Sequence, residues 1–227
     1  MNDNVIPLKG LRGMIADNMM KSIQQSAQLT FLADADVSGL MTLRARLKAD
    51  AMLVGIEDIL LLCLKRALDK HPGLNGVIRD QAVHLSSALN VSVATPIPGG
   101  LAAPTLFNIE ALGLADISAK RRDMIKRAHS NKLAPKEMSG GTFTISNLGL
   151  TKVRYFTPIL NGGQLAIMGL GAIEQRPVCT DNNAIVVKPI LGISLTCDHQ
   201  GVDGQPAGDF LTDFIKEVET IESQFEL

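Results

Sequence analysis

The sequence has little that would suit a secreted or membrane-embedded protein. Its 227 residues include only three cysteines, Cys63, Cys179 and Cys197, an odd number at wide spacing. This usage argues against a disulfide framework and favours a reducing compartment. No apolar run approaches the roughly 18 residues that a membrane-spanning helix needs, and the first ten residues lack a signal-peptide pattern. We therefore predict a cytoplasmic location and no membrane partner.

The sequence also lacks an excess of charge of either sign. Its 22 Lys and Arg residues nearly balance 23 Asp and Glu residues, for a formal net charge of -1. A chain with this balance has no overall field to attract nucleic acid, so we expect no nucleic-acid partner. The cysteines and the four histidines do not fall at zinc-site spacings, so we expect no metal. The 46% apolar and 20% charged content is that of an ordinary globular protein.

Apolar residues at helical spacing predict five helices. These are residues 11–27, a segment that begins after Ser38, residues 56 to about 72, residues 114–130 with a basic face, and the C-terminal segment. Ser38 is expected to cap its helix. Apolar faces are expected on the first, second and last helices, at Leu11, Met14, Ile15, Met19 and Ile23, at Leu40, Leu43 and Leu47, and at Ala207, Phe210, Leu211, Phe214, Val218 and Ile221.

Alternating residues between glycines and prolines predict strands. They cover residues 28–38, 90–96, 142–146, 165–170, 184–188 and 191–197, and residues 77–85 are typical of a hairpin. Strands and helices follow one another without a strict βαβ rhythm, which favours an α+β fold with a mixed sheet. We see no internal repeat or low-complexity linker, so we expect one domain over residues 1–227.

One histidine stands in a setting that suits chemistry. His199 follows an apolar strand and enters a glycine-rich turn, in the stretch CDHQGVDG. A histidine at the end of such a strand can present a ring nitrogen to a cleft as a general base. The pattern is short, and by itself it leaves a structural role for His199 equally open. The other histidines, His71, His84 and His129, suit a helix end, a structural contact and a solvated helix face.

A serine stands in a second promising setting. In GGTFTISNLGL, Ser146 and Asn147 end an alternating strand. A serine at this point can donate a hydrogen bond to a developing oxyanion, although an isolated Ser-Asn pair is more typical of a turn cap. There is no G-x-S-x-G motif, so Ser146 is not expected to be a covalent nucleophile.

Longer segments resemble a known family. IPLKGLRGMIADNM, HPGLNG, NVSVATPIPGGLAAP, LAPKEMSGGTFTISNLG, FTPILNGGQLAIMGLG and DHQGVDG follow in order along the chain. Together they resemble the catalytic domain of the dihydrolipoamide acyltransferases, the core component of 2-oxo acid dehydrogenase complexes of the pyruvate or acetoin type. The match runs almost from end to end and is far more specific than the histidine motif alone.

The resemblance implies a fold, an assembly and a reaction. It implies a chloramphenicol acetyltransferase-like fold, a mixed sheet flanked by helices, that assembles as a homotrimer and further into a 24-mer or 60-mer core. The active site would lie between subunits, with His199 of one facing Ser146 of the next, and Asp203 would support the histidine loop. Coenzyme A and a dihydrolipoyl group would enter from opposite sides, and Arg12 would meet a coenzyme A phosphate. The basic run on the predicted helix 114–130, Lys120, Arg121, Arg122, Lys126 and Arg127, is more typical of a solvated helix face.

The sequence departs from the family pattern at several positions. Gln200 stands where the family usually has arginine, and Gly162-Gly163 stands where it has two prolines. Residues 94–98, ATPIP, also disturb the usual Asp-Thr-Pro run. These changes leave His199 and Ser146 in place but alter the expected pocket shape and loop stiffness.

The family's lipoyl and subunit-binding domains are absent from the sequence, so we expect the lipoyl group to come from a lipoyl domain outside this chain. Acetyl is the expected acyl group, because nothing basic near the motifs would recruit a second carboxylate. Two other readings remain: a coenzyme A-dependent O-acetyltransferase of a small hydroxyl compound, and a catalytically weak structural core subunit.

Overall fold

Six strands pair into one mixed sheet in the computed structural model of the protein, which describes residues 7–180 and 182–225. The strand order is β1-β10-β9-β8-β4-β7. β4 pairs with β8, and β8 with β9, in parallel, while the other pairs are antiparallel. The strands are β1 (Gln28–Asp36), β4 (Val91–Val93), β7 (Thr105–Leu106), β8 (Phe143–Asn147), β9 (Ala166–Cys179) and β10 (Ile185–Asp198). The predicted mixed sheet is confirmed.

Two hairpins lie outside this sheet. The hairpin β2 (Gly76–Arg79) and β3 (Ala82–Leu85) turns at Asp80 and Gln81, which both have positive φ. This is the conformation of a tight two-residue hairpin turn. The second hairpin pairs β5 (Thr95–Ile97) with β6 (Gly100–Ala102). Short 3-10 turns cover Pro72–Leu74, Ile109–Ala111 and Pro135–Met138.

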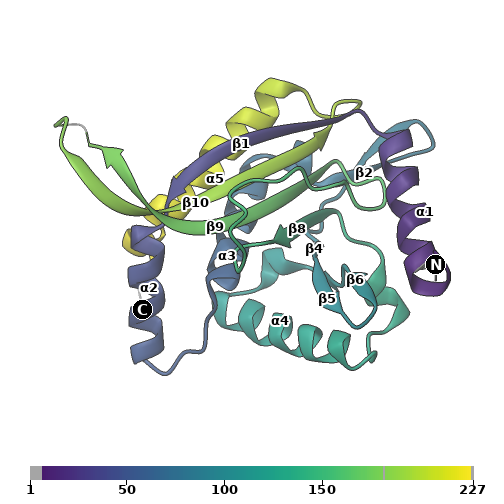
Figure 1. Cartoon of the computed structure of the whole chain (residues 1–227), viewed down its shortest axis with the longest axis horizontal. Helices are drawn as coiled ribbons and strands as arrows, with labels where there is room; N and C mark the ends of the chain where they lie inside the picture. The colour runs from purple at the N-terminus through teal and green to yellow at the C-terminus, as the bar shows by residue number, and fades with distance from the viewer. Residues whose placement is uncertain (1–6, 181, 226–227) are drawn as a thin grey trace, which may run out of the picture.

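Helices cover one face of the sheet (Figure 1). α3 (Ile56–Lys70) and α5 (Gly204–Gln224) pack against each other and the sheet, with α2 (Ser38–Ala49) beside α5 and α4 (Leu114–His129) beside α3. α1 (Gly10–Gln25) stands at the margin of the molecule. Phe143 of β8 meets Phe210 of α5, which stacks on Phe214. The apolar faces expected for the second and last helices are buried as predicted.

The opposite face of the sheet carries a strap, residues 153–156, that lies against three glycines. A Cβ atom added to Gly171 or Gly192 would collide with the carbonyl oxygen of Arg154, and one on Gly169 would meet the Phe156 ring. Glycine is therefore required for this close approach. The strap follows β8 in the chain. Its close packing on the sheet therefore restricts the position of the end of β8.

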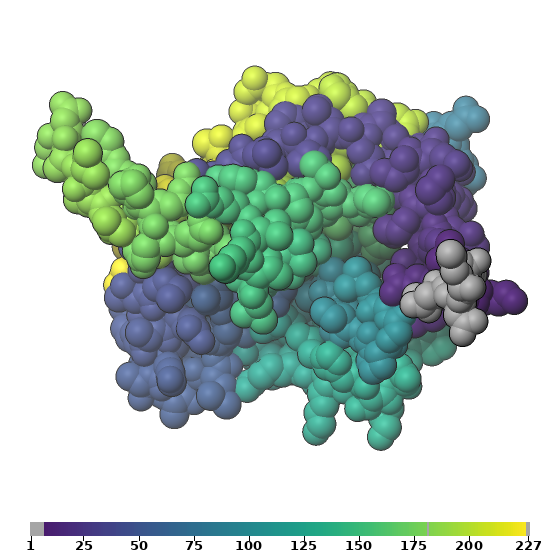
Figure 2. Space-filling view, in the orientation of Figure 1, coloured from purple at the N-terminus to yellow at the C-terminus, as the bar shows by residue number. Residues whose placement is uncertain are grey.

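β9 and β10 continue past the rest of the sheet as a two-stranded arm that projects from the molecule (Figures 1 and 2). We expected two strands, 184–188 and 191–197, but β10 is continuous through Pro189. β1 pairs with β10 only as far as Ile190, so Pro189 lies where that ladder ends, and its carbonyl oxygen accepts the N–H of Val37 at 3.0 Å. The end of a ladder tolerates the missing N–H of proline.

One local prediction was wrong. Ser38 does not cap α2; the Asp36 carboxylate instead accepts the Ser38 N–H at 2.9 Å. The first predicted helix is present as α1, and its apolar face is largely exposed in this chain, since Met14 is 59% exposed and Ser22 is the buried residue of the helix. Among the described residues, no helix has the length and apolar content to cross a membrane.

Candidate active site

His199 lies in a tight turn at the end of β10. The N–H groups of Gly201 and Val202 both donate to the carbonyl oxygen of Asp198, at 3.0 and 2.9 Å, so the chain reverses immediately after the histidine. The His199 N–H donates to the carbonyl oxygen of Ala27 at 2.8 Å, which ties the turn to the chain between α1 and β1. The imidazole is about half exposed, at 47%. The backbone is therefore fixed while the ring remains accessible.

A buried carboxylate orders this turn. Asp198 is 2% exposed, and its Oδ1 accepts N–H groups from Ala27 and Gln200, both at 3.1 Å. The side-chain Nε2 of Gln200 donates to Asp198 and, at 2.8 Å, to the carbonyl oxygen of Gln25. Gln200 therefore supplies neutral donors to Asp198, and the Asp198 carboxylate orders the loop around His199.

Asp203 does not hydrogen-bond to the histidine. Its Oδ1 lies 3.7 Å from Nδ1 of His199, beyond hydrogen-bond distance, and its side chain is 83% exposed. The residue occupies the N-cap position of α5. Residues 199–203 form a turn rather than the helical turn that would have brought the two side chains together.

Ser146 lies in β8, far from His199 of the same chain. The strand register places it level with Gly169 of β9 and Ser194 of β10, and its hydroxyl makes no hydrogen bond to any described residue. His199 follows Ser194 by five positions, which is roughly 17 Å along the strand. One thioester carbonyl cannot lie within hydrogen-bond distance of both side chains, so a single chain does not complete the predicted site.

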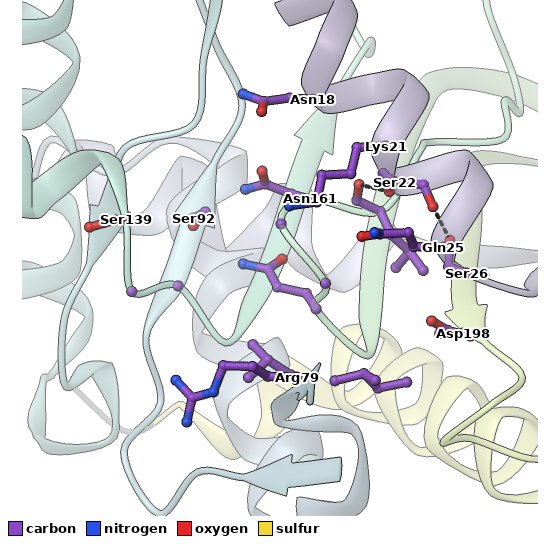
Figure 3. A pocket seen from close by; sticks show the side chains of 18 of the residues that line it. Asn18, Lys21, Ser22, Gln25, Ser26, Arg79, Ser92, Ser139, Asn161 and Asp198 are labelled. Atoms are coloured by element: carbon purple, nitrogen blue, oxygen red, sulfur yellow. Dashed lines mark hydrogen bonds between the residues drawn. The ribbon is translucent and has the colours of Figure 1, made fainter. Parts of the chain in front are cut away.

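A polar cleft of about 860 Å³ opens beside the His199 turn (Figure 3). It lies between α1, the β2–β3 hairpin and the backbone at residues 138–141 and 160–164. Its lining includes four serines and six carboxamides, Asn18, Gln25, Gln81, Asn161, Gln164 and Gln200. Such a lining suits a ligand that carries many hydrogen-bonding groups.

Two cations line this cleft, and sequence reasoning missed both. Lys21 reaches from α1 toward Asn161 in Figure 3, and Arg79 comes from β2. The helical spacing of Asn18, Lys21 and Gln25 as a polar face was the available signal. The sequence argument that nothing basic near the motifs would recruit a second carboxylate did not consider these two residues. Arg12 is exposed on α1 and does not line the cleft.

The cleft floor includes a turn that proline could not form. Gly162 and Gly163 have φ values of 58° and 78°, and the N–H of Gln164 donates to the carbonyl oxygen of Asn161 at 3.1 Å. Proline locks φ near -65°, so neither position could hold proline in this conformation. A proline at either position would therefore require a different local backbone.

The basic face of α4 is only partly solvated, which corrects the sequence interpretation for two residues. Arg121 is 12% exposed and lies between the carboxylates of Glu57 and Asp58. Arg127 pairs with Asp123 and Glu137. His71 also has a partner that its sequence setting did not reveal, Asp213 at 2.8 Å.

The cysteines do not supply a reactive thiol near His199. All three are free, and Cys63 and Cys197 are buried. Burial raises the pKa of the Cys63 and Cys197 thiols to about 12. Neither forms the thiolate that nucleophilic attack requires.

The chain can now be compared with known proteins. The family described as 2-oxoacid dehydrogenases acyltransferase (catalytic domain) matches residues 1–226. The chain belongs to this family. It is 34% identical over 211 residues to the dihydrolipoyllysine-residue acetyltransferase component of the acetoin cleaving system of Bacillus subtilis, covering 91% of this chain and 53% of that protein. It is 30% identical over 219 residues to the corresponding pyruvate dehydrogenase component of Rickettsia bellii, covering 94% and 52%.

Solved structures of this acyltransferase family share the fold. The dihydrolipoamide acetyltransferase of Azotobacter vinelandii is 26% identical with a TM-score of 0.92, over 97% of this chain and 93% of that one. A cubic core of the pyruvate dehydrogenase multienzyme complex is 27% identical with the same TM-score and the same coverage. Chloramphenicol acetyltransferase, 18% identical with a TM-score of 0.57 over 95% and 97%, shares the fold alone. The chain spans about half the length of the curated acyltransferases it matches.

Proposed function

We propose that this acyltransferase domain moves an acetyl group between a dihydrolipoyl group and coenzyme A. The observation that carries the proposal is the family match over residues 1–226, in a chain that holds His199 accessible on an ordered turn. The acetyl group is supported by relatives named for pyruvate and acetoin systems. The dihydrolipoyl group would be carried by a lipoyl domain, and the partners would be the other components of a 2-oxo acid dehydrogenase complex.

His199 would act as a general base toward a thiol. Thiols in ordinary peptides have a pKa near 8.5 and imidazoles near 6.5, so a neutral imidazole is well suited to accept the S–H proton at neutral pH. The thiolate then attacks the thioester carbonyl, a new C–S bond forms, and the old one breaks. The departing thiolate takes back the proton from the imidazolium, so no acyl-enzyme forms.

Ser146 would stabilise the transition state. Negative charge grows on the carbonyl oxygen as the thiolate attacks, and the free Ser146 hydroxyl can donate a hydrogen bond to it. The Azotobacter protein has been studied for the catalytic roles of a serine, a histidine and an asparagine. This chain offers Ser146, His199 and Asp203 in the same order, and support of the histidine loop by Asp203 remains a prediction.

We propose that a second copy of the chain completes the site. His199 and Ser146 lie roughly 17 Å apart along the strands of one chain, so the serine must come from a neighbour if both act on one carbonyl. The exposed apolar residues of α1, Met14, Met20 and Ile23, supply a surface that association would cover. A homotrimer would provide three such shared sites, and assembly into a 24-mer or 60-mer remains a prediction.

The polar cleft is proposed as part of the substrate path. Coenzyme A and dihydrolipoamide both carry amide groups, which the carboxamides of the cleft can bind, and Lys21 can attract a phosphate. The proposal that Arg12 contacts coenzyme A is independent of this cleft. A cytoplasmic location also remains a prediction.

The test is acetyl transfer from acetyl-coenzyme A to free dihydrolipoamide by the purified chain. His199→Ala should lower kcat by about 10²–10⁴-fold as a general base is lost, and Ser146→Ala by about 10²–10³-fold. His129→Ala, at an exposed position of α4, is the matched control and should match the wild type. If the protein still oligomerises but shows no turnover with acetyl, succinyl or branched acyl donors, the result would favour one of the two alternatives. These are an O-acetyltransferase of a small hydroxyl compound and a catalytically weak structural core subunit.

A further inference from the structure

The floor of the polar cleft contains a carboxamide that is almost completely buried. Gln164 is 3% exposed and lines the cleft, so the small part of the residue that solvent reaches opens into it. A carboxamide has two N–H donors and an acceptor oxygen, and a buried donor or acceptor without a partner is costly. The partners of this side chain therefore indicate what the cleft can bind.

One hydroxyl group fixes how this carboxamide is turned. Thr144 of β8 is 1% exposed, and its Oγ1 donates to Oε1 of Gln164 at 2.5 Å. The same Oγ1 accepts a hydrogen bond from Nδ2 of Asn161 at 3.3 Å. A hydroxyl has only one hydrogen, and here it is used toward Gln164. The Thr144 hydroxyl therefore holds two carboxamides, each in a defined orientation.

This arrangement leaves one free end on each carboxamide. Nε2 of Gln164 and Oδ1 of Asn161 make no hydrogen bond to any residue that the structure describes, and both residues line the cleft. The cleft floor therefore offers a hydrogen-bond donor and a hydrogen-bond acceptor, and neither carries a charge.

Glycine at position 141 leaves the free nitrogen of Gln164 uncovered. A Cβ atom on Gly141 would lie 2.9 Å from this nitrogen and 2.1 Å from Oγ of Ser92. A side chain at this position would collide with Ser92 and cover the nitrogen. The Ser92 hydroxyl already has a partner, since its Oγ lies 3.0 Å from Oγ1 of Thr105. Nε2 of Gln164 is therefore a donor with unused capacity at this point of the cleft.

The free ends match an amide group better than a phosphate. Phosphate and carboxylate groups are recognised chiefly by Arg and Lys, and the cations that line this cleft, Lys21 and Arg79, come from α1 and β2. The Gln164 and Asn161 ends are neutral instead. A ligand amide has a carbonyl oxygen that can accept from the first and an N–H that can donate to the second.

We propose that Gln164 and Asn161 form a binding site for an amide group in the arm of a thiol substrate. Nε2 of Gln164 donates to the amide carbonyl oxygen, and Oδ1 of Asn161 accepts an amide N–H. This assignment rests on the proposed function, because coenzyme A and dihydrolipoamide both carry amides in the arm that ends in the thiol. The site holds the arm and takes no part in the chemical step, so its loss acts on KM.

The experiment measures kcat and KM for Gln164→Met with substrates that have or lack the amide. One pair is dihydrolipoamide and an alkyl dithiol without the amide. The other pair is acetyl-coenzyme A and the acetyl thioester of a simple alkyl thiol. For the amide-bearing member of one pair, Gln164→Met should raise KM by about 3-fold to 10-fold, the effect of one hydrogen bond, and leave kcat unchanged. For the amide-free member, kcat/KM should equal the wild-type value.

The pair that responds identifies the arm. A loss confined to dihydrolipoamide would assign the site to the lipoyl arm, and a loss confined to acetyl-coenzyme A would assign it to the coenzyme A arm. An equal loss with the amide-bearing and the amide-free members would overturn the proposal, because it would show a structural role for Gln164. Wild-type values with every substrate would also overturn it, because the free nitrogen would then bind only water.

A second variant tests the hydroxyl that holds both carboxamides. Thr144→Val removes this hydroxyl and keeps the shape of the side chain. It should reproduce the amide-selective rise in KM, because Gln164 and Asn161 lose their fixed orientation. A rise in KM that is the same for amide-free substrates would contradict this role of Thr144.

Gln224→Met is the matched control. Nε2 of Gln224 donates to Oγ1 of Thr220 at 2.6 Å, so this carboxamide is also held by a threonine hydroxyl, but it lies on α5 and does not line the cleft. Gln224→Met should match the wild type with all four substrates. A loss equal to that of Gln164→Met would count against a specific amide site.

Equilibrium binding separates the amide site from the proposed reaction. In calorimetric titrations with coenzyme A and with dihydrolipoamide, Gln164→Met should raise the Kd of one of them by about 3-fold to 10-fold. If this rise is seen but the wild type transfers no acetyl group, the proposed function fails and the amide site stands. If Gln164→Met binds both compounds as tightly as the wild type, the amide site is refuted.

Discussion

At the scale of single residues, the turn at His199 contains a buried carboxylate that is stabilised by hydrogen bonds from neutral groups. Among the residues that the structure describes, the Asp198 carboxylate accepts hydrogen bonds from Ala27 and Gln200, and these donors are neutral. Burial of a charge is tolerated when such donors satisfy it. The same donors join α1, β1 and the turn at His199, so Gln200 helps to fix the backbone there.

A second carboxylate makes the stability depend on pH. Burial would raise the pKa of Asp34, but hydrogen bonds from Arg176 and Tyr155 outweigh it and hold the pKa below its usual value. A carboxyl group whose pKa is lower in the folded state adds to the free energy of unfolding at pH values above its unfolded-state pKa, about 3.9. This contribution is lost as the pH falls through the folded-state pKa. The side chain is 39% exposed, so the contribution is below about 1 kcal/mol.

We expect Asp34→Asn to reduce the loss of Tm between about pH 5 and pH 3, because the titrating group has been removed. Thermal unfolding followed by circular dichroism across this range would measure it. Asp50→Asn, at the exposed end of α2, is the control and should follow the wild-type curve. Parallel wild-type and Asp34→Asn curves would contradict the prediction.

At the scale of an element, the turn at residues 161–164 couples the cleft to the β2–β3 hairpin. Its two glycines have positive φ, and the Gly163 carbonyl accepts the N–H of Ile78 at 2.7 Å. Their surroundings differ, since a Cβ on Gly162 would meet nothing within 4 Å, while one on Gly163 would lie 2.9 Å from the carbonyl oxygen of Ile78. The two positions therefore separate backbone strain from steric collision.

We expect Gly162→Ala to destabilise the fold by about 1–2 kcal/mol, the cost of left-handed backbone for an L-residue. Gly163→Ala should cost at least about 1 kcal/mol more, because its methyl group also displaces the Ile78 backbone. Urea unfolding at equal protein concentration would compare the two midpoints. Equal destabilisation would show that the hairpin moves aside freely.

At the scale of the whole molecule, the sheet register separates the two residues that the sequence suggests should cooperate. Ser146 is level with Ser194, whereas His199 lies beyond the end of β10. The exposed apolar side chains of α1 also suit a subunit of an assembly better than an isolated chain. Both observations are explained together if neighbouring chains share each site.

Mixed oligomers would test this sharing. A His199→Ala chain and a Ser146→Ala chain, each nearly inactive alone, should regain about a quarter of wild-type activity when refolded together in equal amounts. Each shared site takes its histidine from one chain and its serine from a neighbour, and each of these residues is intact in half of the chains, so about a quarter of the sites hold both. Sedimentation would confirm that the mixed species keep the wild-type size. If the mixed oligomers are no more active than the mean of the two variants, the histidine and the serine do not act together in a site shared between two chains.

The sequence by itself determined most of the element types, the mixed sheet and the two residues on which the proposed chemistry rests. Periodicity, turn residues and short motifs are local properties, so α5, the β2–β3 hairpin and the settings of Ser146 and His199 could be predicted. Local signals also had local errors, such as the cap assigned to Ser38 and the break assigned to Pro189.

Only the tertiary structure decided which distant residues meet. The burial of Arg121 between Glu57 and Asp58 and the approach of Lys21 to the cleft beside the His199 turn join segments that carry no shared sequence pattern. Strand register and helix packing set these contacts, and a change of one position in register would dissolve them. The same register holds Ser146 apart from His199, which is the physical reason that the proposed site needs a second chain.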